Sequence, residues 1–141
     1  MNIREAAVGD IFAMYEIRFA VRENGFPDSA AATYKDSIAH LESLGKGWVC
    51  EDDGGVMLGF AFAENDGFIW ALLVRPGHER RGIGTRLLDR CVAWLRQNGV
   101  KRAWLRTAPG TGAEQFYRRR GWRGSRRWWR REIKFTMDVN A

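Results

Sequence analysis

The stretch of sequence that decides the fold runs from Phe68 to Leu95 and reads FIWALLV-RPGHERRGIGT-RLLDRCVAWL. Its first part is a continuous apolar run of strand length that stops at Pro76 and Gly77. Its last part predicts a helix, because apolar residues recur at helical spacing at Ile83, Leu87, Leu88, Cys91, Val92 and Leu95. The stretch therefore predicts a strand that leads through a turn rich in glycine and arginine into an amphipathic helix.

The turn itself, Arg80-Arg81-Gly82-Ile83-Gly84-Thr85, predicts a site for an anion. Glycines let the backbone approach a ligand closely, and the first helical turn has unpaired amide N–H groups at the positive end of the helix dipole. The Walker phosphate loop is excluded because Ile83-Gly84 stand where that loop needs Lys and Ser/Thr. The dinucleotide-binding fingerprint is excluded because Leu87 stands where that motif needs its third small residue. A tight turn that uses two glycines only for its own geometry is the alternative.

This stretch resembles the acetyl-CoA loop of the GNAT superfamily of N-acetyltransferases. That family carries Gln/Arg-x-x-Gly-x-Gly/Ala after a strand that ends in L-x-V-x-P. Here the strand end is Leu72-Leu73-Val74-Arg75-Pro76, and the loop begins at Glu79, which departs from the usual Gln or Arg. A second segment, AEQFYRRRGW from Ala113 to Trp122, resembles the family's A-x-x-F-Y-x-x-x-G-F. The order of the elements also resembles that of the family over the whole chain.

The resemblance implies an N-acetyltransferase that uses acetyl-CoA as cosubstrate to acetylate a primary amine of a small molecule or peptide by direct attack. It assigns cofactor binding to Leu72, Leu73, Val74, Arg80, Arg81, Gly82, Ile83, Gly84, Thr85, Phe116 and Tyr117. Tyr117 would protonate the thiolate that leaves when the tetrahedral intermediate collapses. The amide near Val74 would stabilise the oxyanion. The alternative for Phe116 and Tyr117 is an aromatic pair that packs a short helix on the sheet.

One family feature is missing from the chain. Many members carry a Glu on the fifth strand as general base and an Asn at its end, and those positions hold Leu105 and Gly110. The remaining candidates for the base are Glu64, which we keep as a catalytic candidate, Glu23, and Asp66, which we interpret as a turn residue. Glu114 is explained by a capping box that begins at Thr111. Two alternative functions are therefore an acyl-CoA-binding sensor that has lost its chemistry and, less favoured, a basic nucleic-acid-binding module.

Length and composition predict one N-acetyltransferase domain over residues 1–141. The sequence contains no apolar run long enough to span a membrane, and its first ten residues lack the apolar core of a signal peptide. Cys50 and Cys91 are expected to be small buried residues, and a reducing cytoplasm is the expected compartment. With His40 and His78 far apart in the sequence, we expect no metal site and no interaction with a membrane.

The charge is concentrated in the last third of the chain. The net charge is +6, and residues 101–141 carry 12 Lys or Arg against 3 Asp or Glu. The eight arginines between Arg118 and Arg131 would attract the phosphates of a cofactor or of a nucleic acid, or form a solvated face. Because these arginines are distributed over a helix and a hairpin, we expect no physiological binding of nucleic acid.

The predicted fold is α/β, a mainly antiparallel mixed sheet with about four helices, and the resemblance implies that it splays between strands 4 and 5. The segment from Arg4 to Val8 is expected to be the end of a short first strand, and a helix is expected to run to about Asn24 with Ile11, Met14 and Tyr15 inward. The other expected elements are a helix from Tyr34 to Leu44 that Gly45 and Gly47 cap, strands at 48–51, 56–64 and 100–107, a helix at 112–120, and a last hairpin that buries Ile133, Phe135, Met137 and Val139.

The resemblance also predicts where the acceptor binds. In this fold the walls of the acceptor site come from the first two helices and the last hairpin, here Arg18, Arg22, Glu23, Asn24, Phe26, Trp70, Trp128 and Trp129. Aromatic walls suit a hydrophobic or a cationic acceptor. Trp128 and Trp129 would equally suit a contact between two copies of the chain, so a homodimer is also possible.

Overall fold

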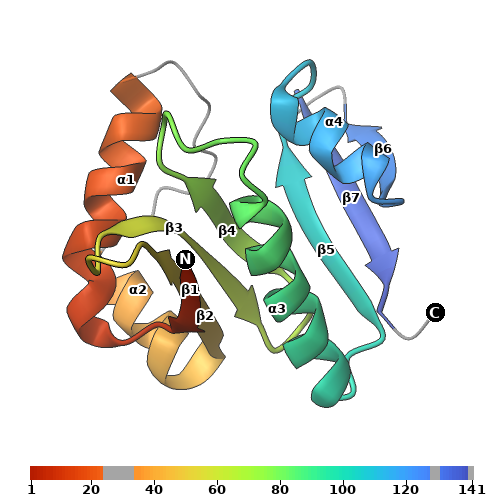
Figure 1. The fold of residues 1–141 in the computed structure, drawn as a ribbon. Helices are drawn as coiled ribbons and strands as arrows, with labels where there is room; N and C mark the ends of the chain where they lie inside the picture. Colours follow the sequence, from red (N-terminus) through yellow and green to blue (C-terminus); the bar gives the residue numbers. More distant parts are fainter. Residues whose placement is uncertain (24–33, 128–130, 140–141) are drawn as a thin grey trace.

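The computed structural model describes residues 1–23, 34–127 and 131–139 of the chain. Its elements are β1 (Asn2–Glu5), η1 (Val8–Asp10), α1 (Ile11–Glu23), α2 (Tyr34–Ala39), η2 (His40–Leu44), β2 (Gly45–Glu51), β3 (Met57–Glu64), β4 (Ile69–Val74), α3 (Ile83–Gln97), β5 (Arg102–Thr107), α4 (Gly112–Arg119), β6 (Arg123–Arg127) and β7 (Glu132–Asp138) (Figure 1). The α/β class and the predicted order of helices and strands are confirmed.

The strands form two antiparallel sheets whose edges face each other. One sheet has the order β1-β2-β3-β4 and the other the order β5-β7-β6. Between β4 and β5, the described residues form only an isolated parallel bridge of Phe68 with Trp104, where the Trp104 amide donates to the Gly67 carbonyl at 2.9 Å. The predicted splay between strands 4 and 5 is therefore confirmed, and both strands have a free edge beyond this bridge.

Helix α3 joins the two sheets into one core. Its buried residues are Ile83, Leu87, Leu88, Cys91 and Leu95, five of the six apolar residues that the sequence predicted, while the sixth, Val92, is only half-buried. They pack in one cluster with Ala61 and Ala63 of the first sheet and with Leu105 and Phe135 of the second. Each fully buried side chain of this size contributes roughly 1.5–3 kcal/mol of apolar burial, so α3 holds the two sheets in a fixed relation although few hydrogen bonds connect them.

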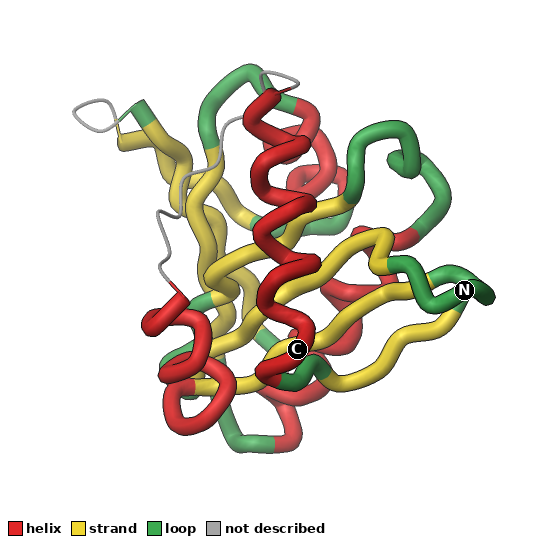
Figure 2. Tube along the Cα trace, turned by 90° about the vertical axis from the view of Figure 1, so that its left-hand side faces the viewer, coloured by secondary structure: helices red, strands yellow, loops and turns green. Residues whose placement is uncertain are grey.

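Helix α1 covers the opposite face of the first sheet, where a second cluster joins Met14, Ile17 and Val21 to Phe60 and Phe62. Figure 2, viewed from the side of α1, shows this helix lying across the strands. The two clusters give the first sheet a helix layer on each side. The side that α3 covers is called the α3 face, and the side that α1 covers is called the α1 face.

Several predicted local features differ in the structure. β1 ends at Glu5 and Val8 begins a 3-10 turn, and Tyr15 is only half-buried while Ile17 takes the core position. Gly47 does not cap the second helix but lies within β2, where an ideal Cβ would be 2.4 Å from the Phe62 ring. The strand expected from residue 100 begins at Arg102. The differences in the strands arise because the pairing partners of a strand are distant in sequence, and the difference in α1 arises because the face that a helix buries is set by the sheet on which it packs.

Candidate active site

The free edge of β4 presents the backbone groups of Leu72 and Val74. The amide of Arg75 donates to the Leu58 carbonyl at 2.7 Å, so the backbone of Arg75 is directed toward β3. Because these directions alternate along an antiparallel pair, Leu73 is also directed toward β3, while Leu72 and Val74 direct their N–H and C=O groups toward β5. Leu72 and Val74 can therefore pair with an extended ligand as an added strand would.

A β-bulge interrupts β4 at Trp70. Phe62 of β3 pairs with Ala71 and Ala63 pairs with Ile69, so Trp70 is the extra residue. The Trp70 ring stacks on Phe62 with centroids 5.1 Å apart, on the α1 face. Bulges commonly redirect a side chain beside a functional site. Nothing in the apolar run 68–74 marks this position, so the sequence could not reveal it.

The loop between β4 and α3 ends in a helix N-terminus that no side chain caps. Gly82 is the N-cap residue, with φ of +81°, and it makes no side-chain capping bond. The first-turn amides of Ile83, Gly84 and Thr85 therefore have no acceptor from within the helix. Arg80, itself at φ of +64°, and Arg81 are exposed beside these amides in sequence. Backbone donors, the helix dipole and the flanking arginines are the groups that bind an anion, so the loop is a candidate anion site.

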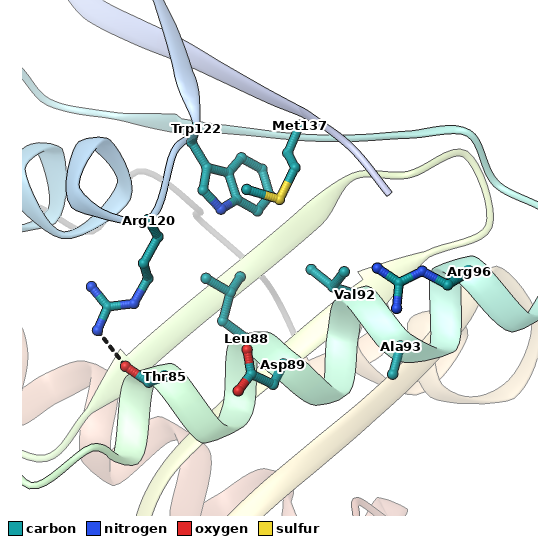
Figure 3. A pocket seen from close by; sticks show the side chains of 9 residues that line it. All are labelled: Thr85, Leu88, Asp89, Val92, Ala93, Arg96, Arg120, Trp122 and Met137. Carbon is teal, nitrogen blue, oxygen red and sulfur yellow. Dashed lines mark hydrogen bonds between the residues drawn. The ribbon is translucent and has the colours of Figure 1, made fainter. Parts of the chain in front are cut away.

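Arg120 is a residue of this site that the sequence analysis missed. From the end of α4 its Nη2 donates to the Thr85 Oγ1 (Figure 3). Its Nη1 donates to the Phe116 carbonyl at 3.0 Å, and its guanidinium lies 3.5 Å from the Phe116 ring centroid. A cation beside the positive end of a helix is unfavourable unless an anion joins it. The spacing of Phe116 and Arg120, i and i+4 in a helix, was the signal that would have indicated it.

An open hollow of about 380 Å³ lies beside this contact, between α3 and the strands that follow α4. Its floor is apolar, and charged side chains stand at its rim (Figure 3); the lining residues are Thr85, Leu88, Asp89, Val92, Ala93, Arg96, Arg120, Trp122 and Met137. The hollow shares Thr85 and Arg120 with the anion site, so the two are continuous.

Tyr117 lies buried on α4 in the same apolar cluster that Leu72 and Val74 border. Its ring is 5.0 Å from Phe116, edge-on, and 5.5 and 5.6 Å from Trp122 and Phe135. Burial raises the pKa of the Tyr117 phenol well above its usual value. The side chain is therefore a neutral hydroxyl near neutral pH, available as a proton donor. At the α4 N-terminus Thr111 is the N-cap as predicted, its Oγ1 accepting from the Glu114 amide at 3.3 Å, but the Glu114 carboxylate accepts from the Gly110 amide at 2.8 Å and not from that of Thr111, so the predicted capping box is only half formed.

Glu64 lies at the other end of β4 and contacts His40. Ala61 is opposite Leu72, so Glu64 is three residues, or about 10 Å, farther along β3. Its Oε1 is 3.4 Å from the His40 Nδ1. Burial, and after it the nearby Asp66, raises the pKa of Glu64, and burial lowers the pKa of His40 to about 4. His40 is therefore a neutral imidazole at pH 7, and its buried Nε2 has no hydrogen-bond partner in the described part of the chain.

Aromatic and cationic side chains gather around His40 on the α1 face. Its ring stacks on Trp70 with centroids 5.2 Å apart, and the Arg18 guanidinium lies 5.2 Å from the Trp70 centroid. Two of the predicted acceptor walls, Arg18 and Trp70, are thus brought together. Asp66 accepts from the Phe68 amide as a turn residue at 3.0 Å. The predicted wall residues Asn24, Phe26, Trp128 and Trp129 lie outside the described residues, as do the side chains of Arg22 and Glu23.

Within the described ranges, no three His, Cys, Asp or Glu side chains are grouped so that they would hold a metal ion. Of the helices described, none combines the length and the apolar character needed to cross a membrane.

Comparisons with known proteins identify the fold and the family. A sequence model described as "Acetyltransferase (GNAT) family" matches residues 11–122. A GNAT-family acetyltransferase from Staphylococcus aureus Mu50 superposes with a TM-score of 0.84, at 16% identity and with 98% of each chain covered. No curated protein sequence gives a significant match.

Two further solved structures share the fold. The ribosomal-protein-S18-alanine N-acetyltransferase of Escherichia coli has a TM-score of 0.78 at 18% identity, with 98% of this chain and 93% of that chain covered. A putative acetyltransferase from Salmonella typhimurium, solved with its cofactor acetyl-CoA, has the same TM-score, 0.78, at 18% identity with the same coverage, 98% and 93%.

Proposed function

This chain belongs to the acetyltransferase (GNAT) family, and from that membership we propose that it transfers an acetyl group from acetyl-CoA to a primary amine of a small molecule or a peptide. The observation that carries the proposal is the juxtaposition of two features: a strand edge free to pair with the pantetheine arm at Leu72 and Val74, and uncapped amides at Ile83, Gly84 and Thr85 that follow it directly in the chain. The first suits the amides of pantetheine and the second suits a pyrophosphate.

Arg120 adds a phosphate contact to this proposal. Its guanidinium is held at the N-terminus of α3 by Thr85 and by the Phe116 carbonyl, and its buried Nε has no hydrogen-bond partner in the described residues. An anion at this place would neutralise the cation and satisfy the amides together. Arg80 and Arg81 would contribute from the exposed side of the loop.

The reaction proceeds in this proposal by direct attack. The amine nitrogen forms a bond to the thioester carbon, and the oxyanion accepts a hydrogen bond from the Val74 amide, which is directed toward β5. When the C–S bond breaks, the thiolate takes the proton of the Tyr117 hydroxyl, and water then restores that proton. No acyl-enzyme is needed: burial raises the pKa values of Cys50 and Cys91, so neither is a ready nucleophile.

The general base is not a residue of β5, which carries no carboxylate. An alkylammonium is overwhelmingly protonated at neutral pH, so it must lose a proton before it attacks. We assign this step to water that passes the proton to bulk solvent past Glu64. Because the two thiols are free, the proposal keeps a reducing cytoplasm as the compartment.

The test is a panel of primary amines assayed with acetyl-CoA by release of the CoA thiol, combined with thermal unfolding. Acetyl-CoA at about 100-fold excess over its Kd should stabilise the protein by roughly 2.7 kcal/mol, a rise of a few degrees in Tm. A rise in Tm with thiol release for at least one amine supports the proposal. A rise in Tm without any turnover over a broad panel would favour the acyl-CoA-binding sensor instead, and no rise would contradict cofactor binding.

A further inference from the structure

A cluster at the junction of the two sheets has no role in the function proposed so far. This junction cluster consists of Phe68, Trp104, Arg106 and Lys134. The rings of Phe68 and Trp104 stack with centroids 4.2 Å apart at the parallel bridge. The Arg106 guanidinium lies 5.2 Å from the Trp104 centroid and 5.7 Å from the Phe68 centroid, and the Lys134 Nζ lies 5.0 Å from the Trp104 centroid. Two cations therefore share one aromatic platform.

The charges along this face of β7 are paired at one end and unpaired farther along. Asp138 is in register with Arg102, whose Nε is 3.6 Å from its carboxylate. Four residues earlier on the same face, Lys134 is directly opposite Arg106 on the neighbouring strand. Residues directly opposite in an antiparallel pair share a face, and like charges there destabilise the pair.

In the described part of the chain, no carboxylate forms an ion pair with Arg106 or Lys134. Among the described residues, neither Arg106 nor Lys134 forms an ion pair or a hydrogen bond through its side chain; their side-chain interactions are those with the two rings. A bound anion between them would remove the repulsion and accept hydrogen bonds from a guanidinium and an ammonium at once.

The junction cluster also has the right position for an acceptor. Ile69 packs in the α3 core, so Phe68 and Trp70 on either side of it belong to the α1 face. Since the bridge aligns Phe68 with Trp104, Arg106 is level with Trp70, about 7 Å along the strand from Leu72. The α3 face carries the loop to which we assign the CoA phosphates, so the acceptor approaches the thioester from the α1 face, past Arg106.

We propose that Arg106 and Lys134 bind an anionic group of the acceptor, and that the acceptor is a primary amine with a carboxylate or a phosphate a few bonds from its nitrogen. This inference rests on the proposed acetyltransferase function. In the reaction, the ammonium loses one proton to water and the resulting amine forms the new C–N bond. As the C–S bond of acetyl-CoA breaks, the thiolate takes the Tyr117 proton, and the nitrogen loses its second proton to water, which returns a proton to the Tyr117 phenolate. The anionic group is unchanged and serves only to hold the nitrogen in place.

The test compares three amines of similar length: 4-aminobutyrate, its uncharged primary amide 4-aminobutanamide, and 3-aminopropylphosphonate. We expect kcat/KM for one or both anionic amines to exceed that of the amide by roughly tenfold or more, and the preferred anion identifies the group as carboxylate or phosphate. Arg106→Gln and Lys134→Gln should each remove most of this preference by raising the KM for the anionic amines. Arg102→Gln, on the same face and already paired with Asp138, is the matched control and should leave the preference intact.

A binding measurement separates this inference from the proposed function. The three amines are titrated into the complex with CoA while tryptophan fluorescence is followed, since Trp70 and Trp104 lie in the site. An anionic amine that binds the parent but not Arg106→Gln, without turnover, would support the anion site and count against acetyl transfer. The inference would be overturned, and the acetyltransferase function left standing, by either of two results. One is equal kcat/KM for 4-aminobutanamide and the two anionic amines, and the other is a preference for the anionic amines that persists in Arg106→Gln and in Lys134→Gln. Failure of both anionic amines to bind would also overturn it.

Discussion

The two ends of the proposed site are built in different ways. The main part of the cofactor end, residues 72–85 of β4, its loop and the start of α3, is continuous in sequence and offers mostly backbone N–H groups, and Arg120 joins it from the end of α4. The acceptor end, with Arg18, His40, Trp70 and Arg106 as its main side chains, collects residues from α1, η2, β4 and β5. A ligand recognised by the backbone of one segment therefore leaves a local motif in the sequence, whereas one recognised by side chains of separate elements leaves none.

The largest effect is expected from a substitution at the cofactor end. Gly84→Glu should abolish the rise in Tm that acetyl-CoA causes, because the new side chain starts 3.4 Å from the Phe116 ring and brings a negative charge against the phosphates. Gly9→Glu, where an ideal Cβ has no neighbour within 4 Å, makes the same change of charge and should keep the rise. An undiminished rise in Gly84→Glu would show that this loop does not bind the cofactor.

The second effect concerns Tyr117, which lies between the two ends. Tyr117→Phe should lower kcat by a factor of about 10² to 10⁴ while the Kd of acetyl-CoA stays nearly the same, since only the proton donor is removed. Because the pKa of Tyr117 is raised, the parent's rate should show no loss from phenol ionisation up to about pH 10. Equal rates in parent and variant, with chemistry shown to limit the rate, would remove Tyr117 from the mechanism.

The third effect tests the buried imidazole of the acceptor end. His40 has a pKa of about 4 when folded and near 6.5 when unfolded. The unfolded chain therefore binds more protons between these values, and the free energy of unfolding should fall by about 2 kcal/mol from pH 7 to pH 5 on this account. His40→Phe keeps a ring against Phe62 and Trp70, and should lose this part of the dependence in urea titrations at the two pH values. The same slope in both proteins would show that His40 is not the titrating group.

The fourth effect returns to the cofactor end and its phosphates. Arg120→Met should raise the KM for acetyl-CoA roughly tenfold, as expected for losing a charge-assisted contact. S-acetylpantetheine, which lacks the nucleotide and its pyrophosphate, is the internal control and should be used equally well by parent and variant. If the substitution raises the KM for acetyl-CoA and for S-acetylpantetheine by the same factor, Arg120 acts by packing on Phe116 and not by binding phosphate.

The smallest effect is expected at Glu64. Glu64→Gln should cost less than Tyr117→Phe, because Glu64 lies about 10 Å along β3 from the level of Leu72 and serves only a water relay in our proposal. The parent's rate should keep rising with pH toward the pKa of the amine. If the rate instead reaches a plateau well below that pKa, and the plateau disappears in Glu64→Gln, Glu64 is a dedicated general base and not part of a water relay.

Local patterns of the sequence were enough to predict the fold class, the order of the elements, most of the buried face of α3, and the loop 80–85. These features depend on local spacing, on glycine and on capping residues, which act within a few positions along the chain. The N-cap at Thr111 and the turn role of Asp66 were predicted for the same reason and are confirmed. The family motif added roles for Val74 and Tyr117, which remain predictions.

Only the tertiary structure decided which distant residues meet. The bulge at Trp70, the contact of Glu64 with His40, the bridge from Arg120 to Thr85 and the pairing of Arg106 with Lys134 all depend on strand register or helix packing. A shift of one residue in register would move each side chain on the shifted strand to the opposite face of its sheet. Register is set by the whole apolar core, held here by α3 between two sheets with free edges, and no local pattern of the sequence contains it.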